Sequence, residues 1–163
     1  MPKQPFAITP GLEPAFELTQ KIALPLPALH DFLCDLHRYV PLHPFIESIQ
    51  DLAPIEGLPA ARAYRVVDRI PLGPFKLKTV YTAALEPVAE DEVHGHAWQS
   101  PNIRLHTVYG LSKAGEGTRL VERCFVDAAG LTRRFVVSQA RKAHAKTLED
   151  MKALLEEGEA SRA

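Results

Sequence analysis

The C-terminal part of the chain constrains the fold most, because it predicts one long helix with a single apolar face. No proline or glycine occurs between Leu131 and about Glu157. A helix of that length would extend roughly 40 Å, and we expect Gly158 to end it. Apolar side chains recur at spacings of three and four residues, which places them on one stripe: Val137, Ala140, His144, Leu148, Met151 and Leu155. Such a stripe needs a broad apolar partner, for which a sheet is well suited.

The middle of the chain predicts that sheet. Apolar and polar residues alternate with a period of two, which is typical of half-buried strands. The expected strands are 16–24, 48–55, 61–72, 75–86, 91–99, 103–113 and 118–127. Short turn sequences separate the later strands, so consecutive strands should pair antiparallel. Several exceed the usual five or six residues, which favours a curved sheet. Between the first two strands we expect two short helices, the first carrying Leu29, Phe32 and Leu33.

The bulk properties fit one ordered domain. The chain has 163 residues, of which 46% are apolar and 24% charged, and its net charge is −1. This balance gives no electrostatic reason to expect nucleic acid as a partner. No apolar run approaches the roughly 20 residues that span a bilayer, and the two cysteines lie far apart. We therefore expect a cytoplasmic protein with reduced thiols, in which a flexible or surface-laid leader (1–13) and a tail (158–163) flank one domain (14–157).

Three stretches look familiar in their order: Ile22–Leu33 with Leu42–Pro44, Gly117–Glu122 and Ala143–Leu148. With the order of the elements, they resemble the START-like (SRPBCC) superfamily, in particular its polyketide cyclase/dehydrase and lipid-transport branch. The resemblance spans about residues 14–157. It implies an α+β helix-grip fold, in which a curved antiparallel sheet of about seven strands surrounds a long C-terminal helix and leaves an internal cavity. The superfamily has no universal catalytic motif, so the resemblance implies no catalytic residue.

Candidate ligand-binding residues follow from the strand faces and from the helix stripe. A ligand pocket needs mostly apolar walls and a few placed polar groups. The small side chains at Thr79, Ala83 and Gly95 are expected to leave room for it. The candidates for the cavity wall are Tyr64, Val66, Asp68, Phe75, Leu77, Tyr81, Leu105, Tyr109, Glu122 and His144.

The polar candidates each allow two interpretations. Asp68 points inward with a raised pKa, or a bulge or salt bridge turns it outward. The hydroxyls of Tyr81 and Tyr109 meet a ligand oxygen, or both rings are core. Glu122 is an internal acid or part of an exposed ion pair. His144 faces the pocket or makes a structural hydrogen bond.

The stretch His94–Trp98 places two histidines and a tryptophan on one face of a strand. This spacing lets both imidazoles reach one metal ion, but a third and a fourth ligand are not evident. We therefore predict neither metal nor cofactor. The opposite face carries Val93, Gly95 and Ala97, and the sequence leaves open which of the two faces is internal.

Three functions remain open at this stage. The first is binding or transport of an apolar or aromatic small molecule that is lipid-, polyketide- or quinone-like. The second is a cyclase or dehydratase that uses one or two acid/base groups of the pocket. The third is a regulatory module that acts on another protein. Two ionisable groups that meet deep in one cavity would favour the enzyme, and a smooth apolar cavity would favour the carrier. A filled core with an exposed apolar patch would favour the regulatory module.

Overall fold

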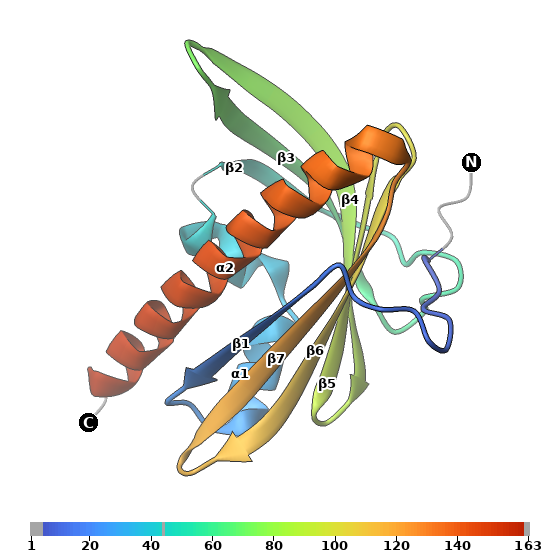
Figure 1. Ribbon diagram of the computed structural model, residues 1–163. Coiled ribbons are helices and arrows are strands. Elements are labelled where there is room, and N and C mark those ends of the chain that lie inside the picture. The colour runs from blue at the N-terminus through green and yellow to red at the C-terminus, as the bar shows by residue number, and fades with distance from the viewer. Residues whose placement is uncertain (1–4, 44, 162–163) are drawn as a thin grey trace.

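One seven-stranded antiparallel sheet forms the body of the protein (Figure 1). The computed structural model describes residues 5–43 and 45–161. The strand order is β1-β7-β6-β5-β4-β3-β2, so that β2 to β7 form a meander and β1 pairs with β7. The strands are β1 (Phe16–Ile22), β2 (Ile46–Leu52), β3 (Arg62–Leu72), β4 (Phe75–Ala89), β5 (Glu92–Gln99), β6 (Ile103–Ala114) and β7 (Gly117–Asp127). The predicted antiparallel sheet of about seven strands is confirmed.

The helices lie on one side of this sheet, the inner face. They are α1 (Leu26–Leu33), the 3-10 helix η1 (Leu36–Leu42) and α2 (Gly130–Ala160). Figure 1 shows α2 crossing the sheet obliquely, and its contacts are with β1, β7 and η1. Pro25 precedes α1 at its N-cap position, and Pro27 lies in the first turn, which accepts proline because the N–H groups there have no helical partner. The helix-grip α+β fold expected from the sequence is therefore present.

The C-terminal half of α2 anchors it to the sheet. Leu148 and Met151 are 4% and 1% exposed and belong to the main core with residues of α1, η1 and the inner strands. Val137 and Ala140 pack against a smaller cluster around Phe16. The first turns of α2 project beyond this support, so that Leu131 there is 83% exposed.

Some predicted boundaries were wrong, for local reasons. The helix α2 continues through Gly158 to Ala160, because a glycine with ordinary helical backbone angles costs only about 1 kcal/mol near a helix end. Strand β4 continues through Pro87 to Ala89, where its register with β5 shifts. A bulge accommodates a proline because its missing N–H need not join the ladder. Among the described residues, no helix is both long and apolar enough to cross a membrane.

Candidate functional site

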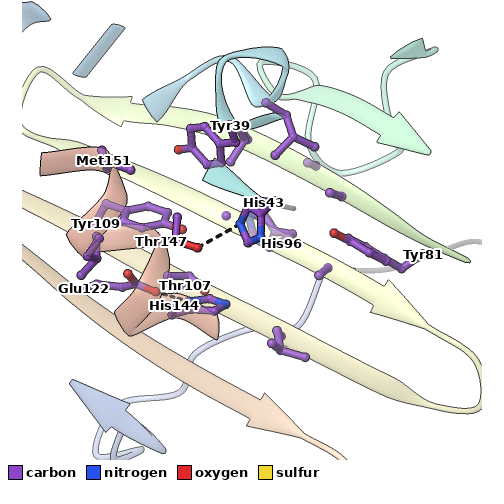
Figure 2. A pocket seen from close by; sticks show the side chains of 18 residues that line it. Tyr39, His43, Tyr81, His96, Thr107, Tyr109, Glu122, His144, Thr147 and Met151 are labelled. Atoms are coloured by element: carbon purple, nitrogen blue, oxygen red, sulfur yellow. Dashed lines mark hydrogen bonds and ion pairs between the residues drawn. The ribbon is translucent and has the colours of Figure 1, made fainter. Parts of the chain in front are cut away.

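A cavity of about 140 Å³ lies on the inner face, between strands β4 to β7 and the helices η1 and α2 (Figure 2). Small side chains on neighbouring strands make the space. Ala83 pairs with Ala97 across β4 and β5, and Gly95 pairs with Thr107 across β5 and β6. A Cβ atom added to Gly95 would lie 3.4 Å from the ring of Tyr109, so even one methyl group would fill part of the space. Apolar side chains such as Leu85, Leu105, Leu148 and Met151 form much of the wall.

Glu122 and His144 meet at this cavity from two different elements. Glu122 lies on β7 and is 1% exposed, whereas His144 lies on α2. His144 Nδ1 donates a short hydrogen bond to Glu122 Oε1. Burial lowers the pKa of His144, but the adjacent Glu122 carboxylate outweighs it, and the pKa rises above 6.5. Because Nδ1 is engaged, Nε2 is the nitrogen of this ring that a ligand can meet.

A second polar pair lies beside the first. The Thr147 hydroxyl donates to Ala143 O at 2.8 Å, so it accepts from His43 Nε2 at 3.1 Å (Figure 2). Burial, and then repulsion from His144, lowers the pKa of His43 below 6.5. The site thus holds one imidazole that favours the charged form and one that favours the neutral form.

Two buried tyrosines also belong to the polar part of the wall. The Tyr39 hydroxyl donates to Leu33 O at 3.0 Å, which ties η1 to the end of α1. Burial raises the pKa of Tyr39 and of Tyr109 well above 10, and the charge of Glu122 adds to both shifts. Both phenols therefore remain neutral near physiological pH, and Tyr109 lies close to the Glu122 carboxylate (Figure 2).

The structure brings together part of the predicted set. Tyr81, Leu105, Tyr109, Glu122 and His144 all line the cavity. Glu122 is internal rather than part of an exposed pair, and its partner is His144 itself.

The other candidates lie elsewhere. Tyr64 and Val66 are fully packed in the core. Asp68 is half-buried beside Tyr81, where burial raises its pKa despite a hydrogen bond to that tyrosine. Phe75 and Leu77 are 74% and 49% exposed and do not line the cavity, which corrects the expectation for them. They lie at the end of the β3–β4 hairpin, which projects beyond α2 (Figure 1). The apolar side chains on this part of the strand therefore have no helix to pack against.

The candidate set lacked the groups that close the cavity from the helix side. Thr147 follows His144 by three residues, so helical spacing could have indicated it. Tyr39 and His43 lie on either side of Pro41, where no regular period exists. The sequence places His43 near the pocket entrance formed by the short helices, but it does not indicate where either side chain points.

The face of His94, His96 and Trp98 is now defined. Val93 belongs to the main core and Gly95 lies at the cavity, so the aromatic residues occupy the opposite, outer face. Other parts of the chain cover this outer face, and His96 also contributes to the lining of the cavity. Trp98 packs with Leu58 and Ala61 of the segment between β2 and β3, and His96 is only 4% exposed.

A third histidine, His106 of β6, lies directly opposite His96 in the sheet register. Burial, together with the neighbouring imidazoles, lowers the pKa of His96 to about 3, and burial also lowers the pKa of His106. Sequence reasoning missed His106 because nothing local to β5 indicates which residue of β6 faces it.

The comparisons with solved structures support the START-like fold. A START superfamily protein from Mycobacterium smegmatis superposes with a TM-score of 0.63 at 18% identity, covering 86% of this chain and 97% of that one. The Zhui aromatase/cyclase from Streptomyces sp. R1128 gives 0.65 at 13% identity, covering 86% and 92%. The di-domain ARO/CYC protein StfQ from the steffimycin biosynthetic pathway gives 0.69 at 12% identity, covering 89% and 51%.

The chain therefore has the START-like helix-grip fold that these structures share. No protein-family model matches it, and no curated protein matches its sequence.

Proposed function

We propose that the cavity binds a small, mostly apolar molecule that contains a ring and carries one polar group. The observation that carries this proposal is the pair of the buried Glu122 and the partly buried His144 in an otherwise largely apolar wall. Ligand pockets have this composition, because apolar surface supplies affinity and a few polar groups fix orientation. The polar group of the ligand would face His144 Nε2 and the Tyr109 hydroxyl.

The size of the cavity favours a ring over a long acyl chain. A volume of about 140 Å³ is close to the roughly 150 Å³ of engineered apolar cavities that hold benzene. The cavity would enclose one small ring, or one end of a larger polyketide- or quinone-like molecule. The two aromatase/cyclase structures with this fold agree with an aromatic ligand.

The free thiols of Cys34 and Cys124 are consistent with a cytoplasmic location.

A screen of ring compounds tests the proposal. Phenols, naphthols, quinones, flavonoids and aromatic polyketides would be compared with fatty acids by thermal shift. A ligand at 100 times its Kd should stabilise the folded protein by about 2.7 kcal/mol, which corresponds to roughly 5–10 °C for a domain of this size.

Two tryptophan variants of β4 locate the binding. Ala83→Trp would fill the cavity and should abolish the shift, whereas Val80→Trp, at a position 40% exposed on the same strand, should retain it. The absence of any saturable shift, or a shift that survives Ala83→Trp, would rule out this cavity as the binding site.

The same pair supports a second candidate function, an enzyme of the dehydratase or cyclase type. His144 has a raised pKa and faces the cavity, as a general acid/base group requires. In a dehydration, the neutral form of His144, with its proton on Nδ1, would take a proton at Nε2 from a carbon next to a carbonyl. It would then return that proton to the departing hydroxyl, so that a C=C bond forms and water leaves. Glu122 would hold the ring and stabilise its imidazolium form.

One variant separates carrier from enzyme. A β-hydroxy aromatic ketone would be incubated with the wild-type protein and with His144→Gln, and the products analysed by mass spectrometry. A carrier returns the compound unchanged in both cases. An enzyme releases the dehydrated product, and His144→Gln abolishes this release while the thermal shift changes by only a few degrees.

A further inference from the structure

The outer face of the sheet carries a cluster of three histidines, of which His96 is also among the residues that line the cavity. One ligating nitrogen from each of His94, His96 and His106 can be chosen so that all three lie within 4.8 Å of one another. The rings of His96 and His106 are 4.3 Å apart between centroids, and those of His94 and His106 are 4.8 Å apart. The cluster is separated from Glu122 and His144 by the sheet itself, because it lies on the opposite side of β5 and β6.

The outward nitrogens of two of these rings contact groups that only accept hydrogen bonds. His106 Nδ1 lies 2.7 Å from the backbone carbonyl oxygen of Phe6, and His94 Nε2 lies 2.8 Å from Glu92 Oε1. A carbonyl and a carboxylate both require a donor. In the neutral rings, these outward nitrogens therefore carry the protons, and the inward nitrogens carry lone pairs.

These inward nitrogens face each other. His94 Nδ1 and His106 Nε2 are 2.9 Å apart, a distance at which two lone pairs repel unless a positive group lies between them. Hydrogen bonds that orient the far nitrogen of an imidazole towards a carboxylate or backbone carbonyl are the arrangement commonly found behind metal-bound histidines.

His96 supplies an independent observation. Its side chain is 3% exposed, and neither of its ring nitrogens has a hydrogen-bond partner among the described residues. A buried polar group without a partner costs free energy and calls for an explanation. Its Nε2 is 3.5 Å from Glu86 Oε2, which places one carboxylate beside the cluster.

We propose that His94, His96 and His106 bind a first-row transition-metal dication such as Zn²⁺. The ligand atoms are His94 Nδ1, His106 Nε2 and one ring nitrogen of His96, and the fourth position is taken by Glu86 or water. Zn–N bonds of 2.0–2.1 Å in tetrahedral geometry separate ligand nitrogens by about 3.3 Å. The 2.9 Å contact therefore has to widen by about 0.4 Å, and separations of up to 4.8 Å have to close by as much as about 1.5 Å. The prediction of no metal rested on an incomplete ligand set on β5, and the register of β6 supplies the third ligand.

Phe6, near the N-terminus, lies against this site: its carbonyl oxygen accepts a hydrogen bond from His106, and its ring lies 5.6 Å from the guanidinium of Arg104. Asp127 offsets the charge of Arg104, whose Nε donates a hydrogen bond to Asp127 Oδ2. Metal binding would therefore tie the leader to the sheet through the His106 ring.

Competition titration with a chromophoric chelator tests the proposal on the full chain. The wild-type protein should bind one equivalent of Zn²⁺, and Co²⁺ should give the visible spectrum of a tetrahedral site. Loss of an outer-sphere partner typically weakens binding about 10- to 100-fold, so Glu92→Gln should weaken it about tenfold. His96→Phe, which keeps a ring in place but removes both nitrogens, should weaken it at least about 100-fold.

Three further variants locate the bound ion. His94→Gln, at a position whose side chain is 19% exposed, provides a second ligand variant in case His96→Phe does not fold. His37→Gln, which changes a half-exposed histidine paired with Asp51, should leave the affinity unchanged. The absence of stoichiometric binding in the wild-type protein would overturn the proposal. So would binding that survives both ligand variants, or binding that is lost only with His144→Gln.

Discussion

The two faces of the sheet bury polar groups in opposite ways. On the inner face, the carboxylate of Glu122 has the imidazole of His144 as its partner, and Thr147 accepts from His43. On the outer face, His96 is buried to a similar degree, but its nitrogens have no partner within residues 5–43 and 45–161. The outer histidines come from β5 and β6, whereas the inner polar groups come from β7, from α2 and from the end of η1, so the inner face gains its partners from helices packed on the sheet.

This difference teaches what each region is suited to hold. A paired group at the edge of a cavity is stable as it stands and still offers a hydrogen-bonding atom to a ligand. On the outer face, His94 Nδ1 and His106 Nε2 lie 2.9 Å apart, and each nitrogen carries a lone pair in the neutral ring. Such an arrangement is suited to a cation. The inner face therefore suits an organic molecule, and the outer face suits a metal ion.

The largest expected effect concerns the apolar frame of the inner face. Leu148→Ala should destabilise the protein by about 2–5 kcal/mol, because the side chain is 4% exposed and its removal leaves a void. Leu131→Ala, on the same helix but 83% exposed, should cost less than about 0.5 kcal/mol. Denaturant titration measures both. Equal losses in the two variants would mean that the C-terminal half of α2 does not anchor the fold.

A smaller effect is expected from the inner polar pair, and it should depend on pH. Glu122→Gln removes a charged hydrogen bond and should cost about 1–3 kcal/mol at pH 6. The folded-state pKa of His144 lies above its usual 6.5. The pair therefore contributes its full stabilisation below pH 6.5 and loses it as the pH rises through the folded-state value. The difference between wild type and variant should shrink from pH 6 to pH 9 in denaturant titrations. A difference that grows with pH would contradict the assignment.

The outer face should respond to substitution in the opposite sense. In the presence of a chelator, His96→Phe should change the stability by less than about 1 kcal/mol, or increase it, because an apolar ring replaces a buried polar group without a partner. Thermal melts with and without Zn²⁺ measure this, since the ion should stabilise only the wild-type protein. A loss above 2 kcal/mol in chelator would show that the His96 nitrogens have partners after all.

Local patterns predicted the elements well. Period-two alternation identified the strands, and spacings of three and four residues identified α2 and its buried Leu148 and Met151. These patterns work because they report which face of an element is apolar. They do not report whether anything covers that face, which is why Phe75 and Leu77 were expected inside although the hairpin projects into solvent.

The sequence alone could not predict which side chains of different helices and strands contact each other. Glu122 and His144 were both candidates, but their hydrogen bond depends on how α2 crosses β7. His106 joins His94 and His96 only because β5 and β6 pair in one particular register. A shift of one residue would have placed it on the inner face.

Histidine side-chain NMR provides the most direct test of the division between the two faces. Long-range ¹H–¹⁵N spectra of the imidazoles would be recorded with 2-naphthol and, separately, with Zn²⁺. The account predicts that 2-naphthol shifts the nitrogens of His144 and His43 and leaves His94, His96 and His106 in place. Zn²⁺ should do the reverse. Movement of the outer histidines with 2-naphthol, or of His144 with Zn²⁺, would contradict the central claim that the two faces hold different kinds of ligand.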